Sequence, residues 1–159
     1  MGNITFNTEF NFYQDPEAAC IVLQAGFKNV RLIPWETCLK AEPKGEQISR
    51  LYNDSTPLGQ LHKQSNDHML DANDGKYFII DTLTAVSIID ESSILSSFEA
   101  IGCVDVSTGM SKGTLQLFTP KSCGYQKQLM TEKFGVDTSR MNLTVITEID
   151  LHKAISLIA

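Results

Sequence analysis

The sequence predicts an α/β fold with an open, mixed and mainly parallel sheet, flanked by helices and containing an antiparallel hairpin. Two patterns carry this prediction. Near the N-terminus a helix is followed by a tight turn and a short strand, and further along two alternating apolar segments are joined by a turn-rich stretch. With 159 residues, 42% of them hydrophobic, the chain is expected to form one domain over residues 1–159.

Residues 15–27 are predicted to form a helix, because Asp15 is a candidate N-cap and Pro16 suits the first helical position. Gly26 is expected to end this helix, and residues 30–33 to form a short buried strand. The apolar face expected at helical spacing consists of Ala18, Ala19, Ile21, Val22 and Ala25.

The middle of the chain, residues 43–75, is polar and irregular, with a helix expected over 46–52 and a loop over 66–75. The segment that follows is mostly apolar. Residues 77–80 suit a buried strand, and Asp81 suits the start of a buried helix.

The C-terminal part changes character. Residues 103–106 and 114–118 alternate between polar and apolar positions around a turn-rich stretch, which predicts the β-hairpin. Residues 142–146 read as another strand, and 150–158 as a closing amphipathic helix. Its expected apolar face consists of Leu151, Ala154, Ile155 and Ile158.

Composition excludes several classes of protein. A net charge of −6 and a pI near 5.0 argue against a nucleic-acid partner, which needs clustered Lys and Arg. No apolar run is long enough for a membrane span, and the N-terminus does not resemble a signal peptide, so we expect a cytoplasmic location. The scattered cysteines indicate neither a zinc site nor a disulfide framework: Cys20, Cys38, Cys103 and Cys123.

The N-terminal segment is unusually rich in amide and carboxylate side chains, with Asn3, Asn7, Glu9, Asn11 and Asp15 directly before a helix start. If the segment is extended, these odd-numbered side chains share one side, and apolar and aromatic residues share the other. Such a polar face suits a polyhydroxylated ligand, because each hydroxyl both donates and accepts hydrogen bonds. The alternative is a solvent-exposed edge or turn with ordinary polar residues.

Residues 2–19 closely resemble a family signature, GN-x5-EFN-x3-DPEAA, of the inosine/uridine-preferring nucleoside hydrolases. Further similarities follow in the expected order. Residues 30–35 resemble the strand after the signature helix, residues 77–85 resemble the family's HDPLA element, and residues 110–114 resemble the end of its hairpin, TRG-x-T. The resemblance covers essentially the whole chain.

This resemblance implies a calcium-dependent hydrolase that cleaves the N-glycosidic bond of purine or pyrimidine ribonucleosides. It implies that Asn3, Glu9 and Asn11 are the catalytic and substrate-binding residues that hold the ribose hydroxyls, and that Asp81 is a calcium ligand from the loop before the apolar helix. Carboxylate and amide oxygens would stabilise the positive charge that develops on the ribose as the base leaves. The metal would lower the pKa of the attacking water.

The chain also departs from the family. The family's DxDxGxDDA cluster, which supplies most calcium ligands and the general base, is absent from these residues, and Ile80 replaces the histidine before Asp81. One carboxylate falls short of the roughly 6–8 oxygens that calcium prefers. We therefore expect the chain alone to be inactive as a hydrolase and, with apolar faces uncovered, able to form homo-oligomers.

Two functional hypotheses remain open at this point. The chain is either part of a nucleoside hydrolase that is catalytic only in its complete form, or a non-catalytic ribose-binding or interaction module derived from that family. A dinucleotide-binding enzyme is not supported, because no G-x-G-x-x-G follows a strand.

Overall fold

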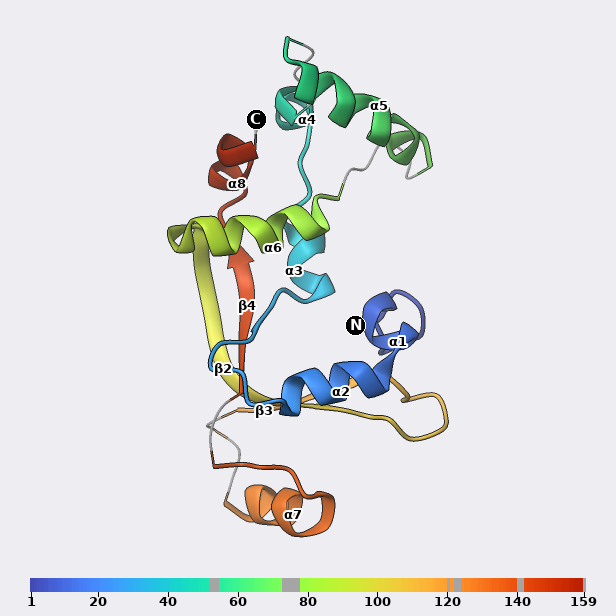
Figure 1. The fold of residues 1–159 in the computed structure, drawn as a ribbon, viewed down its shortest axis with the longest axis vertical. Coiled ribbons are helices and arrows are strands. Elements are labelled where there is room, and N and C mark those ends of the chain that lie inside the picture. The colour runs from blue at the N-terminus through green and yellow to red at the C-terminus, as the bar shows by residue number, and fades with distance from the viewer. Residues whose placement is uncertain (52–54, 73–77, 120, 122–123, 140–141, 159) are drawn as a thin grey trace. The chain divides into compact units, whose positions relative to one another are not determined.

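The computed structural model describes residues 1–51, 55–72, 78–119, 121, 124–139 and 142–158 (Figure 1). The chain divides into two compact units, which are described one at a time. Unit 1 comprises residues 1–35 and 97–146, and unit 2 comprises residues 36–96 and 147–159.

The sheet has four strands in the order β1-β4-β2-β3. Their bounds are β1 Arg31–Leu32, β2 Ile94–Val104, β3 Leu115–Phe118 and β4 Leu143–Ile149. Strand β1 pairs with β4 in parallel, and β2 pairs with β3 in antiparallel register, with Val104 opposite Leu115. The mixed sheet and the hairpin are thus confirmed. The parallel pair is short because β1 has only two residues, so parallel pairing is a smaller part of the sheet than expected.

The described helices of unit 1 are α1 Phe10–Gln14, α2 Pro16–Gln24 and α7 Gly124–Phe134. The expected start of α2 is confirmed, because the Asp15 carboxylate accepts a 2.8 Å hydrogen bond from the Ala18 amide and Pro16 occupies the first turn. Its end is confirmed as well, with Ala25 as C-cap and Gly26 at a φ of 80°.

The expected apolar face of α2 is wrong. Ile21 and Val22 are 67% and 50% exposed, and the buried side is formed by Leu23 with half-buried Ala19 and Cys20. Both stripes of this helix are apolar and have the same i, i+3, i+4, i+7 spacing, so the pattern alone does not identify the inward one.

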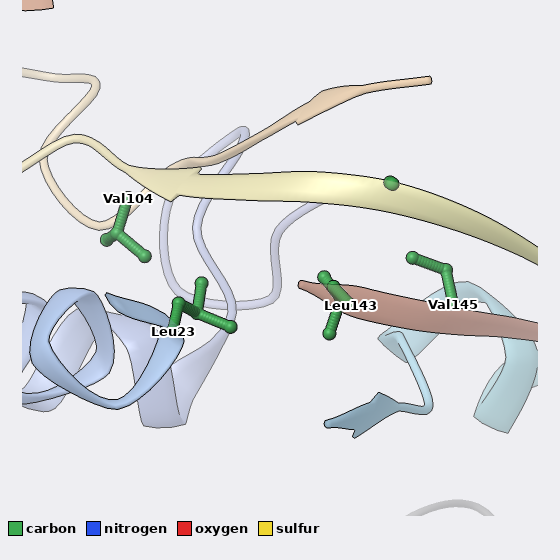
Figure 2. Close-up of a cluster of buried hydrophobic side chains, with 5 residues drawn as sticks. Leu23, Val104, Leu143 and Val145 are labelled. Atoms are coloured by element: carbon green, nitrogen blue, oxygen red, sulfur yellow. The ribbon is translucent and has the colours of Figure 1, made fainter. Parts of the chain in front are cut away.

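The core of unit 1 lies where α2 meets β2 and β4 (Figure 2). Leu23 points from α2 toward Leu143, with Val104 of β2 and Val145 of β4 in the same cluster. The buried members of this cluster are Leu23, Ala100, Val104, Leu143 and Val145. Full burial of each large side chain contributes about 1.5–3 kcal/mol, so this cluster holds α2 against the sheet.

Asn142 joins the same three elements through its side-chain amide. Its Nδ2 donates to the Leu23 carbonyl at 2.9 Å, and its Oδ1 accepts from the Gly102 amide at 2.8 Å. Both halves of a partly buried amide are therefore satisfied, as the low polarity around it requires.

Unit 2 is mainly helical among its described residues. Its elements are α3 Trp35–Lys40, which begins on the last residue of unit 1, α4 Glu46–Leu51, α5 Pro57–Ala72, α6 Ile80–Ile89, the short 3-10 helix η1 Glu91–Ser93 and α8 Leu151–Ile158. Helix α8 packs against α4 and α6. Its expected inward face is confirmed at Ala154 and Ile155, which are buried, while Ile158 is 41% exposed. None of the helices in the described ranges is long and apolar enough to cross a membrane.

Two expectations for unit 2 are wrong. The loop expected over 66–75 is helical as far as Ala72, where α5 ends, and residues 73–75 lie outside the described residues. The strand expected over 77–80 is not formed either, because Ile80 begins α6 and Ile79 is its buried N-cap; residue 77 lies outside the described residues. A short apolar run fits a buried helix start as well as a strand.

Candidate functional site

The N-terminal polar segment is folded, not extended. Residues 3–7 form a bend and Phe10 begins α1, so the expectation that the odd-numbered polar side chains share one side of a strand is wrong. The backbone carbonyl of Thr8 accepts hydrogen bonds from the amides of Asn3, Ile4 and Thr5 at 3.3, 3.2 and 3.4 Å. Three successive amides converging on one oxygen close the segment into a compact loop, residues 2–8, which we call the N-terminal loop.

Gly2 is required by the tightness of the N-terminal loop. A Cβ at this position would lie 2.5 Å from the Thr8 nitrogen and 2.6 Å from its oxygen, which are backbone atoms that cannot move aside. The Thr5 hydroxyl reinforces the closure by accepting from the Thr8 amide at 3.1 Å. The tight closure of this loop therefore requires glycine at position 2.

Asn3 lies in the N-terminal loop, and Glu9 and Asn11 follow it at the start of α1; all three are predicted site residues. Asn3 Oδ1 accepts from the Phe10 amide at 2.8 Å, and Glu9 Oε2 accepts from the Asn11 amide at 2.9 Å as the N-cap of α1. Asn3 and Asn11 are exposed and Glu9 is half-buried. The two hydrogen bonds orient one amide and one carboxylate. They leave the Asn3 Nδ2 group as a donor and the remaining lone pairs of the Glu9 carboxylate as acceptors for a ligand.

The other polar residues of the segment have local roles. Asp15 caps α2, as described above, so its carboxylate serves the helix. Asn7 is exposed, and its backbone amide donates to the Thr5 hydroxyl at 3.4 Å. Asp15 therefore caps a helix, and the binding role predicted for Asn3, Glu9 and Asn11 stays a prediction.

The N-terminal loop is anchored on the turn of the hairpin, residues 105–114. The side chain of Thr8 is fully buried, and its hydroxyl donates to the Lys112 carbonyl at 2.9 Å and lies 3.5 Å from the Thr114 hydroxyl. Gly113 has a φ of +81°, and a Cβ there would lie 2.6 Å from the Thr8 methyl group and 2.8 Å from the Phe12 carbonyl oxygen. The N-terminal loop and the hairpin turn thus touch at Gly113, and a larger residue there would displace Thr8 or the Phe12 carbonyl.

Sequence reasoning missed Thr8. It occupies an unspecified position of the signature, and its partners lie more than 100 residues away in the sequence. A sequence signal was the Gly113-Thr114 pair in the last matched motif, because the N-terminal loop contacts the hairpin turn at these two residues.

Charge also links the hairpin turn to α2. The Lys112 ammonium and the Glu17 carboxylate form an ion pair at 3.0 Å, and the hydrogen bond from Lys112 lowers the pKa of Glu17. Within the turn, hydrogen bonds from Ser107 and Ser111 lower the pKa of Asp105. Exposed groups such as these contribute little stability individually.

Asp81, the predicted metal ligand, lies in the first turn of α6 rather than in a preceding loop, and it is exposed. It belongs to unit 2, whereas Asn3, Glu9 and Asn11 belong to unit 1. Because the units are described separately, a shared site remains a prediction.

The donor set of the described residues does not by itself fit a calcium ion. Among these residues no group of three or more His, Cys, Asp or Glu side chains gathers to hold a metal. Asp81 supplies one carboxylate, and calcium prefers roughly 6–8 oxygens. Cys38 is buried and Cys20 and Cys103 are half-buried, while Cys123 lies outside the described residues.

The fold is that of the nucleoside hydrolases. The structure is similar to an inosine-guanosine nucleoside hydrolase (TM-score 0.83, 23% identity), with 99% of this chain and 46% of that chain covered. It is also similar to a plant nucleoside hydrolase, the PpNRh1 enzyme (TM-score 0.77, 20% identity), covering 99% of this chain and 48% of the other. A purine-preferring ribonucleoside hydrolase from Gardnerella vaginalis gives a TM-score of 0.75 and 20% identity, with coverage of 99% and 48%.

The family assignment rests on the sequence. Residues 1–156 match the model of the inosine-uridine preferring nucleoside hydrolase family, so the chain belongs to that family. No curated protein matches the chain. The chain spans about half the length of the solved structures to which it is similar.

Proposed function

We propose that this chain carries the ribose-binding part of an enzyme that hydrolyses the N-glycosidic bond of ribonucleosides, releasing ribose and the free base. The proposal is supported by the positions of Asn3, Glu9 and Asn11, which lie in the N-terminal loop and directly after it. Two of these side chains are already oriented by the backbone amides of Phe10 and Asn11. A preorganised set of amides and a carboxylate is suited to a sugar with several hydroxyl groups.

Glu9 and Asn3 would act on the charge of the reacting sugar. When the bond between the anomeric carbon and the base nitrogen breaks, its electron pair leaves with the base and the ribose becomes positively charged. The half-buried carboxylate of Glu9 and the Oδ1 atom of Asn3 present negative charge and a dipole to a ribose held between them. Stabilisation of this kind needs no reorganisation during the reaction, because the hydrogen bonds fix both groups beforehand.

The rest of the chemistry requires groups that the described residues do not assemble. A water molecule must lose a proton as its oxygen attacks the anomeric carbon, and the leaving base must gain a proton. Ile80 stands where the family signature has a histidine and cannot donate one, and Asp81 alone does not complete a calcium site. We therefore propose that the isolated chain binds ribonucleosides without rapid turnover.

Isothermal titration with inosine and uridine tests the ribose-binding proposal. Glu9→Gln is expected to weaken binding roughly tenfold or more, because a hydrogen bond to a charged group contributes about 1.5–3 kcal/mol. Asn11→Ala is expected to weaken binding by up to roughly tenfold, because a neutral hydrogen bond contributes about 0.5–1.5 kcal/mol. Glu46→Gln, an exposed change in α4 of unit 2, is the matched control and should leave affinity unchanged. Equal affinity in wild type and both site variants would refute the assignment.

An assay of base release distinguishes an enzyme from the alternative, a non-catalytic ribose-binding or interaction module. The alternative is favoured by Ile80, which stands where the family signature has a histidine. The chain is incubated with ribonucleosides in the presence and absence of calcium, and free base is measured by chromatography. Turnover that falls in Asp81→Ala supports a catalytic chain with a metal at Asp81. Binding with no detectable release at any calcium concentration, not even the slow turnover expected of an incomplete enzyme, supports the module. Cytoplasmic location and self-association stay predictions.

A further inference from the structure

The structure singles out Thr8, a residue that the signature leaves unspecified, at the junction of the N-terminal loop and the hairpin turn. Its carbonyl closes the loop by accepting from the amides of Asn3, Ile4 and Thr5. Its side chain is fully buried and points to the hairpin turn. Thr8 also directly precedes Glu9, so any shift of its backbone moves the carboxylate of the proposed site.

The hydroxyl of Thr8 is the polar link between loop and turn. It donates to the Lys112 carbonyl at 2.9 Å and lies within 3.5 Å of the Thr114 hydroxyl. A buried hydroxyl is stable only when it is hydrogen-bonded, so the position of Thr8 is set by the position of that carbonyl. The methyl group of the same side chain packs on Gly113, where the lack of a Cβ admits it.

We propose that Thr8 is a positioning residue for ribose binding: its hydroxyl, held by the hairpin turn, fixes the loop that presents Asn3 and Glu9. The identity of the ligand, ribose, rests on the proposed function. The anchoring of the loop does not, because its geometry can be measured without a ligand. A displacement of about 1 Å in a positioned group can cost roughly 100-fold in rate, so an anchor of this kind matters to the site it holds.

The first test measures amide hydrogen exchange by NMR in the full chain. The amides of Phe10 and Asn11 report the hydrogen bonds to Asn3 and Glu9. Thr8→Val keeps the shape of the side chain but removes the hydroxyl, and should reduce the protection of these two amides about tenfold, with the amides of β2 and β3 unchanged. Thr8→Ser keeps the hydroxyl and should retain the protection.

A matched control is Thr144→Val. It removes a hydroxyl that donates to Glu99 Oε1 at 2.7 Å in the same unit, away from the loop. This variant should leave the Phe10 and Asn11 amides unaffected. Unchanged protection in Thr8→Val would overturn the proposal, and so would a loss spread equally over β2 and β3, which would indicate a general structural role.

The second test is inosine binding by the same variants. Thr8→Val should weaken affinity about tenfold, and Thr8→Ser should restore it to within about twofold. If Glu9→Gln weakens binding and Thr8→Val does not, the positioning role is wrong and the proposed function stands. If neither changes binding while the exchange result holds, the proposed function is wrong, and the anchoring of the loop is still established by the exchange measurement.

Discussion

Replacing Gly113 by alanine should destabilise unit 1. Two costs combine. The φ of +81° lies in the left-handed region, which costs a residue with a Cβ about 1–2 kcal/mol. The added carbon would also lie 2.6 Å from the Thr8 methyl and 2.8 Å from the Phe12 carbonyl oxygen. Overpacking of this kind costs about 1–3 kcal/mol, so the expected total is about 2–5 kcal/mol.

Gly135→Ala separates the two costs. Gly135 lies in the same unit at a similar φ of +65°, but a Cβ there would have no atom within 4 Å. The free energy of unfolding is measured by urea titration and, for the β2 and β3 amides, by hydrogen exchange. It should fall by about 1–2 kcal/mol in Gly135→Ala and by a further 1–3 kcal/mol in Gly113→Ala. Equal losses in the two variants would show that the loop and the turn are not in contact as described.

Three further predictions follow from contacts in unit 1. Leu23→Ala should cost about 2–5 kcal/mol of unfolding free energy by urea titration, whereas Ile21→Ala, on the exposed stripe of the same helix, should stay within about 0.5 kcal/mol; similar losses would show that the inward face is wrongly assigned. The ion pair of Glu17 with Lys112 lowers the folded-state pKa of the carboxylate, so its contribution is present above the ordinary pKa of Glu and is lost as pH falls through the lowered value. Thermal unfolding from pH 7 to pH 3 should therefore depend less on pH in Lys112→Met than in wild type, and parallel curves would contradict this. Asn142→Leu should cost about 1–3 kcal/mol, because the Leu23 carbonyl loses its donor, and a neutral result would show that water replaces the amide.

The elements that could be predicted from the sequence are those with local signals. Asp15 and Pro16 mark the start of α2 with a cap and a ring that suit the first turn, and both act as expected. The hairpin likewise follows from alternation around a turn, although β2 begins at Ile94, well before the alternating segment. The helix expected over 46–52 is confirmed as α4, which ends at Leu51.

The missed elements depend on contacts that no local pattern contains. The side of α2 that faces the core is decided by Val104 and Leu143 on distant strands, and both stripes of the helix are apolar enough to fit. The polar composition of residues 66–72 suggested a loop, but the segment continues α5. A polar helix lacks the apolar stripe by which a helix is recognised in a sequence.

The candidate site shows the same division. Family resemblance indicated Asn3, Glu9 and Asn11, and the structure places them in a bend and at the start of α1 instead of the extended segment we expected; their role in a site stays a prediction. The bend arises because the Thr8 carbonyl offers a common acceptor to three amides, a closure that alternation of polar residues does not reveal. The role of Thr8 could not be predicted from the local sequence, because the Lys112 carbonyl that its hydroxyl binds lies far along the chain.

The closure on a single carbonyl also fixes how many residues the N-terminal loop can have. Inserting or deleting one residue between Gly2 and Glu9 would turn successive amides away from the common oxygen and rotate the carboxylate off its cap. The spacing of five residues between Asn3 and Glu9 is therefore as important to the geometry of the loop as the asparagine and the glutamate themselves.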